Sequence, residues 1–223
     1  MSDLNPHRPE WVRWIPAVIL VVIMTGMAIF GVVAVPRLTA DPGPAETDEV
    51  TDLNWSVFTD DGLAYIEAAR TPRIDLSSPP VDAVGLGLPA DGATTVGPHE
   101  TGLDYRLVLI ATDEQPNGAL FTTPQFTVST SGGRLQSVRV EERGAFDFRE
   151  TYLLLADRSA DLGYTPPEPA RLAAAVTEAR ESGEPAVVRS NRSLSTGMGV
   201  TAEATCFGAG FCQVSYVVTP AVG

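Results

Sequence analysis

The sequence predicts an α+β protein, with a single N-terminal transmembrane helix followed by one extracytoplasmic domain. In that domain one or two helices are expected to cover a mainly antiparallel sheet. Three observations predict this fold class. An uncharged apolar run occupies residues 15–35, and short runs that alternate between apolar and polar residues recur after residue 100. Residues 165–183 carry helix start and stop signals around an apolar stripe.

Residues 15–35 predict a membrane-spanning helix. These 21 residues carry no formal charge, and at about 1.5 Å per residue they span about 31 Å, close to the thickness of a hydrocarbon core. Trp11, Arg13 and Trp14 precede the run, where aromatic and basic side chains prefer the membrane interface. A cleaved signal peptide is the alternative, but its apolar region is usually about 7 to 15 residues long. We therefore expect a retained anchor.

The basic residues predict the orientation of this anchor. Arg8 and Arg13 precede the apolar run, and only Arg37 follows it closely. Because cytoplasmic flanks carry the excess of basic residues, residues 1–14 are predicted to form a cytoplasmic tail. The chain is then a single-pass protein of the cell membrane, with its C-terminal domain outside the cytoplasm.

The segment after the anchor predicts an acidic disordered linker over residues 36–52. It combines three prolines with five carboxylates and has almost no large apolar side chain, so it cannot bury enough surface to order itself. The folded domain is expected over residues 53–223.

The composition excludes several classes of function. The net charge of −13 argues against nucleic acid as a partner, because phosphate binding depends on clustered basic residues. All 15 basic residues are arginine. The absence of lysine excludes Schiff-base lysines, serine–lysine dyads and Walker A loops. It also indicates the codon usage of a GC-rich bacterial genome.

The first part of the domain predicts a hairpin and a long loop. Asp60, Asp61 and Gly62 suit a turn between two apolar runs, so we expect a hairpin there, although residues 63–70 also fit a short helix. Residues 71–104 are rich in proline, glycine, aspartate and serine. They are predicted to be mainly loop, with room for a strand or a binding surface.

Strands dominate the next part of the chain. Residues 105–112 predict an interior strand, because a short run of apolar, aromatic and β-branched residues lies between turn signals. Residues 126–130 and 134–142 predict a hairpin joined by Ser131, Gly132 and Gly133. Residues 146–163 fit either a helix that ends at Gly163 or a strand.

Residues 165–183 predict the clearest helix of the domain. Thr165 suits the N-cap, Pro166 the first helical position, Glu168 the capping box, and Gly183 the C-terminal end. The apolar stripe of this helix is thin, so we expect it to cover one face of a sheet. It consists of Leu172, Val176 and Ala179. Residues 185–190 then predict another short strand.

The two cysteines predict a disulfide-locked hairpin near the C-terminus. Apolar residues alternate with polar ones before Cys206 and after Cys212, with a five-residue loop between the cysteines. If the cysteines face each other, both sulfur atoms share the inward face, and an oxidising compartment permits the bond. We expect a structural bond worth about 2 kcal/mol. The same register pairs Ala204 with Val214, Ala202 with Tyr216, and Val200 with Val218.

No residue is predicted to be catalytic, and none is predicted to bind a cofactor or a metal. His99 is the only histidine of the predicted outer domain, and no G-x-S-x-G elbow accompanies it. We expect it to be a loop histidine in an exposed turn. Residues 113–118 offer oxygen ligands but lack the acid spacing of a calcium hand. Three pairs of neighbouring carboxylates predict turn or solvent positions: Asp60 and Asp61, Asp113 and Glu114, and Glu141 and Glu142. Asn54 and Asn191 fit glycan acceptor motifs, which we discount in a bacterial chain.

The anchor and the lack of catalytic motifs favour one function class. We expect a membrane-anchored extracytoplasmic binding or assembly module, a non-catalytic accessory subunit of a bacterial envelope or membrane complex. Its expected partners are membrane lipid and a membrane or envelope protein. Two alternatives stay open: an envelope hydrolase that uses dispersed carboxylates or His99, and a receptor for an ion or solute whose pocket lies in residues 71–104.

Overall fold

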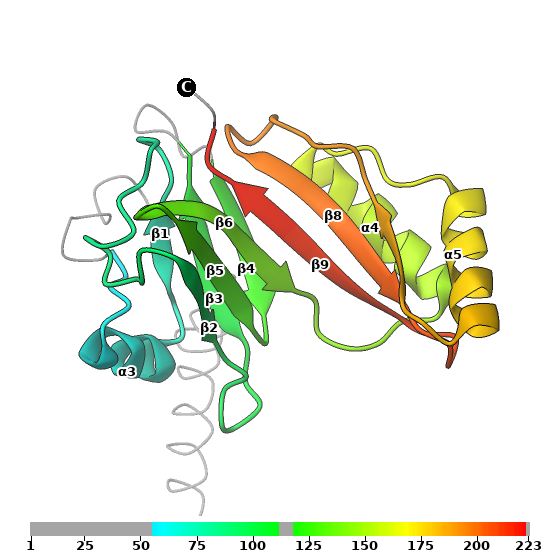
Figure 1. The fold of residues 1–223 in the computed structure, drawn as a ribbon, viewed down its shortest axis with the longest axis horizontal. Coiled ribbons are helices and arrows are strands. Elements are labelled where there is room, and N and C mark those ends of the chain that lie inside the picture. Colours follow the sequence, from blue (N-terminus) through cyan, green and yellow to red (C-terminus); the bar gives the residue numbers. More distant parts are fainter. Residues whose placement is uncertain (1–54, 112–117, 222–223) are drawn as a thin grey trace, which may run out of the picture. The chain divides into compact units, whose positions relative to one another are not determined.

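The computed structural model describes residues 55–111 and 118–221 and has an α+β fold (Figure 1). Its helices are α3 (Asp60–Ala69), α4 (Phe148–Leu162) and α5 (Pro169–Ser182). Its strands are β1 (Arg73–Asp75), β2 (Gly92–Val96), β3 (Tyr105–Ile110), β4 (Gly118–Thr123), β5 (Phe126–Ser131), β6 (Arg134–Glu141), β7 (Ala186–Arg189), β8 (Gly199–Cys206) and β9 (Cys212–Thr219). The predicted tail, anchor and linker, with Trp11, Arg13 and Trp14, lie outside the described residues. No helix within the described residues is long and apolar enough to cross a membrane.

The strands form two sheets, and their pairing confirms the predicted antiparallel character. The larger sheet has the order β2-β5-β6-β9-β8-β7, and every neighbouring pair in it is antiparallel. The smaller sheet has the order β1-β3-β4, in which β1 and β3 are parallel. The predicted strand at residues 105–112 is confirmed as β3.

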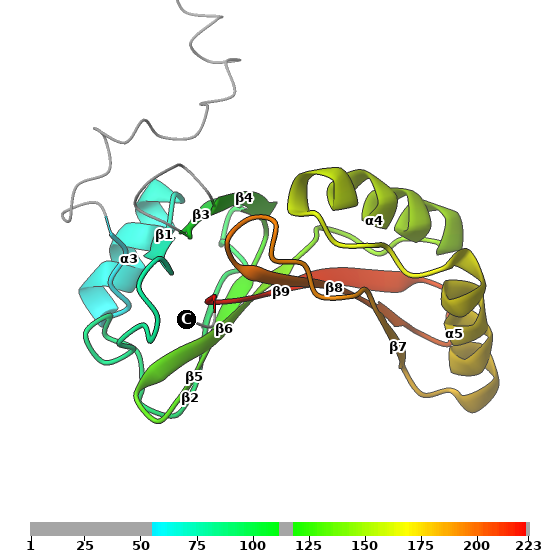
Figure 2. The same cartoon turned by 90° about the horizontal axis from the view of Figure 1, so that it is seen from above.

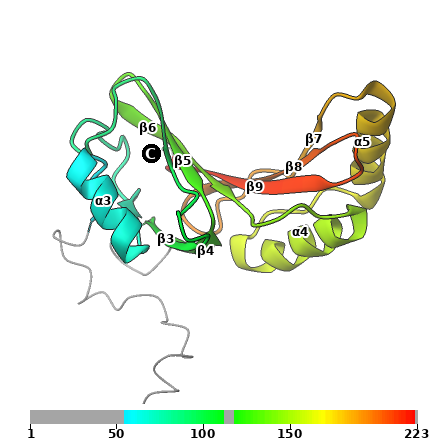
Figure 3. The ribbon, with the colours of Figure 1, turned by 90° about the horizontal axis from the view of Figure 1, so that it is seen from below.

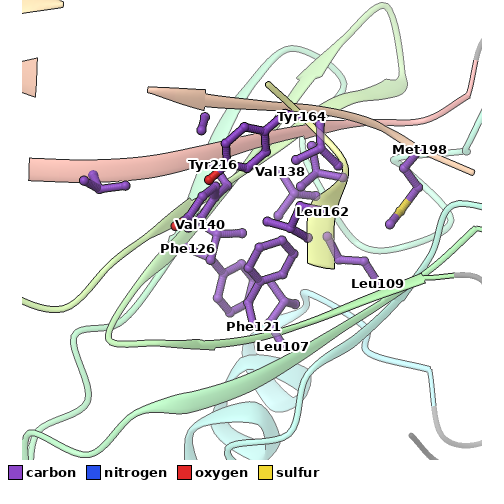
Figure 4. Close-up of a cluster of buried hydrophobic side chains, with 14 of the residues drawn as sticks. Leu107, Leu109, Phe121, Phe126, Val138, Val140, Leu162, Tyr164, Met198 and Tyr216 are labelled. Atoms are coloured by element: carbon purple, nitrogen blue, oxygen red, sulfur yellow. The ribbon is translucent and has the colours of Figure 1, made fainter. Parts of the chain in front are cut away.

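One core joins the two sheets and the helices. Side chains of β3 and β4 meet side chains of β5, β6 and β9, together with residues that follow α4 (Figure 4). Phe121 on β4 lies 5.7 Å from Tyr216 on β9, between ring centres. The smaller sheet and α4 lie on the same side of the larger sheet (Figure 2). Helix α5 packs on β7 and β8 through the predicted stripe of Leu172, Val176 and Ala179, which is confirmed as buried.

The C-terminal hairpin has the predicted register. Cys206 lies opposite Cys212, and the pairs Ala204 with Val214, Ala202 with Tyr216, and Val200 with Val218 follow. All eight side chains are buried. The cysteines are joined by a disulfide bond, with 3.9 Å between their Cα atoms. The alternation of the sequence therefore decided both the inward face and the pairing.

The predicted hairpin over residues 126–142 is also confirmed, with Gly132 and Gly133 between β5 and β6. Its pairing shifts at Ser129 and Thr130, where β6 contains a β-bulge. Leu135 and Val138 both point into the core across this bulge, three positions apart. The bulge therefore changes which side chains of β6 reach the opposite face.

The predicted hairpin around Asp60 and Asp61 is wrong, because these residues begin α3. The side chain of Thr59 caps the helix by accepting a hydrogen bond from the Gly62 amide at 3.3 Å. Both aspartates stand in the first helical turn, where the helix dipole favours negative charge. Ile66 is buried by this helix. The alternative of a short helix was the better interpretation.

Residues 146–163, whose sequence fits either a helix or a strand, contain α4. Asp147 accepts a hydrogen bond from the Glu150 amide at 2.8 Å, and the Glu150 side chain accepts one from the Asp147 amide at 3.1 Å. This reciprocal capping box starts the helix. Gly163 ends it in the left-handed conformation, as predicted.

The predicted start of the next helix is wrong by several residues, although its end at Gly183 is confirmed. Thr165 does not cap it, because Thr165 lies several residues before the first helical turn. The Thr165 amide instead donates to the Oδ1 atom of Asn191 at 2.6 Å. The first helical residue is Pro169, and Glu168 before it is extended without a side-chain cap. A residue that precedes proline avoids the helical region, so the helix cannot begin earlier.

Residues 71–104 are less irregular than predicted, since they contain β1 and β2. Both strands lie at the edge of a sheet. Three and five residues long, they are too short to give a clear alternation of apolar residues. No strand was predicted at residues 118–123, where β4 lies.

Candidate functional site

The larger sheet has one covered face and one uncovered face. The smaller sheet, α4 and α5 pack on the covered face, and no helix of the described residues lies on the other (Figures 2 and 3). Side chains that point away from the core on β5 to β9 make up the uncovered face. Most of them carry hydroxyl, amide or charged groups: Thr127, Ser129, Ser137, Arg139, Glu141, Arg189, Thr201, Glu203, Thr205, Gln213, Ser215 and Thr219. This polar surface is the candidate functional site.

A charged cluster crosses four strands of the uncovered face. Glu203 on β8 binds Arg189 on β7, with 2.5 Å between Oε1 and Nε. Its Oε2 atom lies 2.7 Å from Nη1 of Arg139 on β6. The same Nη1 donates to the hydroxyl of Ser215 on β9 at 2.7 Å. We call these four residues the Glu203 cluster.

The electrostatics of the cluster depend on Glu203, whose side chain is only 8% exposed. Burial alone would raise its pKa, but hydrogen bonds and charge from Arg189 and Arg139 hold the pKa below the ordinary value. The pKa of the neighbouring Glu141 is shifted in the opposite direction. Burial raises its pKa, Arg139 offsets part of that rise, and the charge of Glu203 adds to it. The cluster therefore holds Glu203 as a carboxylate.

A hollow of about 820 Å³ lies at one end of the uncovered face. Its lining includes Arg134 and Gln136 from β6, and Thr201 and Thr219 from β8 and β9. Arg192, from the loop after β7, donates to the Thr219 hydroxyl at 2.9 Å. Apolar residues complete the lining: Pro79, Pro80, Val81, Leu135, Val217, Pro220 and Ala221. We call this hollow the arginine groove.

A smaller hollow of about 380 Å³ shares Pro80 and Val81 with the arginine groove. Trp55, Arg73 and Asp75 contribute to its lining. The Nη1 atom of Arg73 is buried and has no hydrogen-bond partner within the described residues. This hollow lies largely in residues 71–104, where the sequence predicted room for a binding surface.

His99 is less exposed than the predicted loop histidine, because its side chain is 14% exposed and contacts α3. Its Nδ1 atom accepts from the Thr101 amide at 3.1 Å, so the proton belongs on Nε2. Nε2 donates to the backbone oxygen of Glu67 at 3.1 Å and lies 3.5 Å from the carboxylate. His99 therefore ties its loop to α3.

Two hydroxyl groups lie close to His99 and Glu67. Thr101 brings its hydroxyl within 2.8 Å of Nδ1 of His99, and the Tyr105 hydroxyl donates to the carboxylate of Glu67. Burial, and then the hydrogen bond and charge of Glu67, raise the pKa of Tyr105. The hydroxyl beside His99 comes from its own loop and not from a serine of another element. The hydrolase alternative stays a prediction.

Glu142 is not the solvent residue that was predicted. Its side chain is 13% exposed and binds Arg158 of α4, with 3.3 Å between Oε1 and Nε. Burial raises the pKa of Glu142, while Arg158 partly offsets that rise. The Tyr216 hydroxyl is buried and has no hydrogen-bond partner among the described residues. Glu141 ends β6 on the uncovered face, whereas Glu142 lies just after the strand and binds α4, so the two neighbours face different environments.

The other predicted positions are not brought together into a site. Asp60 and Asp61 lie in the first turn of α3. Asp113, Glu114, most of the calcium candidate at 113–118, and Asn54 lie outside the described residues. Asn191 caps no helix but accepts from the Thr165 amide. Within the described residues no group of three or more histidine, cysteine or acidic side chains has the geometry to bind a metal.

The comparisons with known proteins give no match. No family model matches the chain, and neither a curated protein nor a solved structure does. The candidate site therefore depends on the geometry and chemistry of the described residues.

Proposed function

We propose that this chain is a membrane-anchored extracytoplasmic binding module that acts as an accessory subunit of a bacterial envelope or membrane complex. The uncovered face of the larger sheet is where it binds a protein partner. The observation that carries this proposal is the Glu203 cluster, an ordered polar array on a face that no described helix covers. An array of this kind offers the partly exposed guanidinium groups of Arg139 and Arg189 to a partner in fixed positions, at a low entropic cost of ordering.

Two further observations support the proposed location. The disulfide bond between Cys206 and Cys212 fits an oxidising compartment outside the cytoplasm. The uncharged run at residues 15–35 has the length and composition of an anchor.

Copurification tests the proposal. The full chain is extracted from its native membrane in a mild detergent and captured by an N-terminal tag. We expect a stoichiometric protein partner with the natural chain, and loss of that partner with Thr205→Trp, which places a bulky ring on the uncovered face. Thr177→Trp is the matched control, because Thr177 is exposed on α5. A chain that purifies alone, or a partner retained equally by both variants, contradicts the proposal.

A receptor for a small solute is the second candidate, and the hollow beside Arg73 favours it. A buried guanidinium nitrogen without a partner is costly, and a small anionic or zwitterionic ligand would offset that cost. Thermal melting with calcium, and with a panel of amino acids and small carboxylates, tests this candidate. A ligand that raises the melting temperature in the natural chain but not in Arg73→Gln supports it. Equal melting curves throughout contradict it.

A further inference from the structure

We propose that the arginine groove binds an extended acidic peptide segment of a protein partner. The inference rests on the proposed function and deepens it, because it names the chemistry of one part of the binding face. Arg134 and Arg192 would each hold a carboxylate, and the apolar residues between them would hold the side chains that separate the carboxylates.

Neither arginine of the groove is held by an acidic side chain of the described part of the protein. Within the described residues neither Arg134 nor Arg192 lies within ion-pair distance of a carboxylate, whereas Arg139, Arg158 and Arg189 all do. A guanidinium without an internal carboxylate keeps donors available, although Arg192 uses one of them for the Thr219 hydroxyl. Carboxylates match that geometry with two parallel hydrogen bonds.

The backbone places both side chains on the uncovered face. Arg134 precedes the β-bulge of β6 and Gln136 is its extra residue, and both are exposed beside the buried Leu135. Arg192 lies across Gly199, where an added Cβ would be 2.2 Å from its Nε atom. Only glycine leaves room for the guanidinium there. The position of Arg192 is thus fixed by Gly199 and by its hydrogen bond to Thr219.

The lining of the groove favours a peptide over a phosphate polymer. Seven of the twelve lining residues are apolar, and three of these are prolines. A phosphodiester chain exposes charge along its whole length and would leave that apolar surface without contacts. A peptide in which acidic and apolar residues alternate satisfies both parts of the lining. The volume of about 820 Å³ fits a short extended segment.

Peptide binding to the full chain in detergent micelles tests the inference. The probe is a fluorescein-labelled peptide of alternating aspartate and valine, with an asparagine and valine peptide as its uncharged control. We expect the acidic peptide to bind by fluorescence anisotropy, and to bind less tightly as salt is raised. The control peptide should bind at least roughly tenfold more weakly, a difference of about 1.4 kcal/mol.

Three variants assign the binding to the groove. The double variant Arg134→Gln with Arg192→Gln should weaken binding by roughly a hundredfold, about tenfold for each lost bidentate pair. Arg149→Gln with Arg171→Gln makes the same change in net charge on exposed positions of α4 and α5, and should leave binding unchanged. Gly199→Ala keeps every charge but displaces Arg192, so it should weaken binding by roughly tenfold.

Several results would overturn the inference. They are equal binding of the two peptides, equal binding by the two double variants, and tripolyphosphate binding in place of the peptide. Binding that appears only after the five carboxylates of residues 36–52 are neutralised would also overturn it, since the groove would then belong to the chain's own acidic segment. The proposed function would survive any of these results, because the Thr205→Trp copurification depends on a different part of the face.

Discussion

Arg139 on β6 reaches across β9 to bind Glu203 on β8, with 2.7 Å between Nη1 and Oε2. The two residues stand on strands that are not neighbours, so their contact joins three strands of the larger sheet. Arg189 binds the other carboxylate oxygen from β7. These contacts thus hold the side chains of the Glu203 cluster in place relative to one another.

Glu203→Gln is expected to lower the free energy of unfolding by about 1 kcal/mol near neutral pH, because two charge-assisted hydrogen bonds weaken while both arginines keep partial access to water. The folded-state pKa of Glu203 is lowered from 4.5. Its stabilising contribution is therefore present above pH 4.5 and disappears as pH falls through the lowered pKa. Urea denaturation near neutral pH and in acid measures the free energy of unfolding of the natural chain and of Glu203→Gln. If the difference between them persists in strong acid, the assigned role of the Glu203 carboxylate is wrong. Glu178→Gln on the exposed side of α5 is the control.

Replacement of both cysteines by alanine should lower the free energy of unfolding by about 2 kcal/mol, because the short loop of the hairpin gains freedom in the unfolded chain. Thermal melting with and without a reducing agent measures the change. The reductant should affect the natural chain and leave the double variant unaltered. Quantitative alkylation of both sulfur atoms without prior reduction would show that the bond does not form in the native protein.

Gly163→Ala is expected to cost roughly 2 kcal/mol or more, through left-handed strain and a steric clash. The φ angle of Gly163 is 71°, and an added Cβ would lie 1.8 Å from Oγ of Ser195. Gly183→Ala is a matched control, with a φ angle of 76° and no heavy atom within 4 Å of the added carbon. It should cost about 1 kcal/mol, the strain alone. Equal losses in the two variants would exclude the clash.

Glu142 and Glu203 should titrate on opposite sides of the ordinary glutamate pKa of 4.5, with Glu142 above it and Glu203 below it. The raised pKa means that the folded state favours protonated Glu142, so this residue contributes more stability as pH falls through its folded pKa. Arg158→Met removes the cation that lowers the pKa of Glu142, and should raise that pKa further. NMR titration of the side-chain carboxyl carbons measures the pKa of Glu142 and of Glu203 in the natural chain and in the variant. A pKa of Glu142 that falls in the variant contradicts the assignment.

The C-terminal hairpin was predictable in full because several local signals agreed there. Alternation from Val200 to Cys206 and from Cys212 to Val218 fixes the inward faces, and the two sulfur atoms fix the register. Helix α4 could also be predicted from the sequence. Its Asp147 and Glu150 stand at capping-box spacing, a signal that decides between the helix and the strand.

Other elements needed information that local patterns lack. Thr59 to Gly62 fits both a turn and a helix start, and the burial of Ile66 decides for the helix. The residues of the Glu203 cluster were missed for a related reason. Arg139, Arg189 and Glu203 occupy outward positions of predicted strands, so a polar face could be expected, but their contacts depend on the strand order. Strand order is set by packing between residues that are far apart in the chain, and local sequence patterns do not reveal it.

Photo-crosslinking in intact cells tests the central claim most directly, namely that the uncovered sheet face binds an envelope protein outside the cytoplasm. A photoreactive residue replaces Gln213, which is exposed on β9 of that face, or Thr177 on α5 as the control. The account predicts one discrete adduct of higher mass from position 213, accessible to protease added outside the cell, and none from position 177. No adduct from position 213, or the same adducts from both positions, would contradict it.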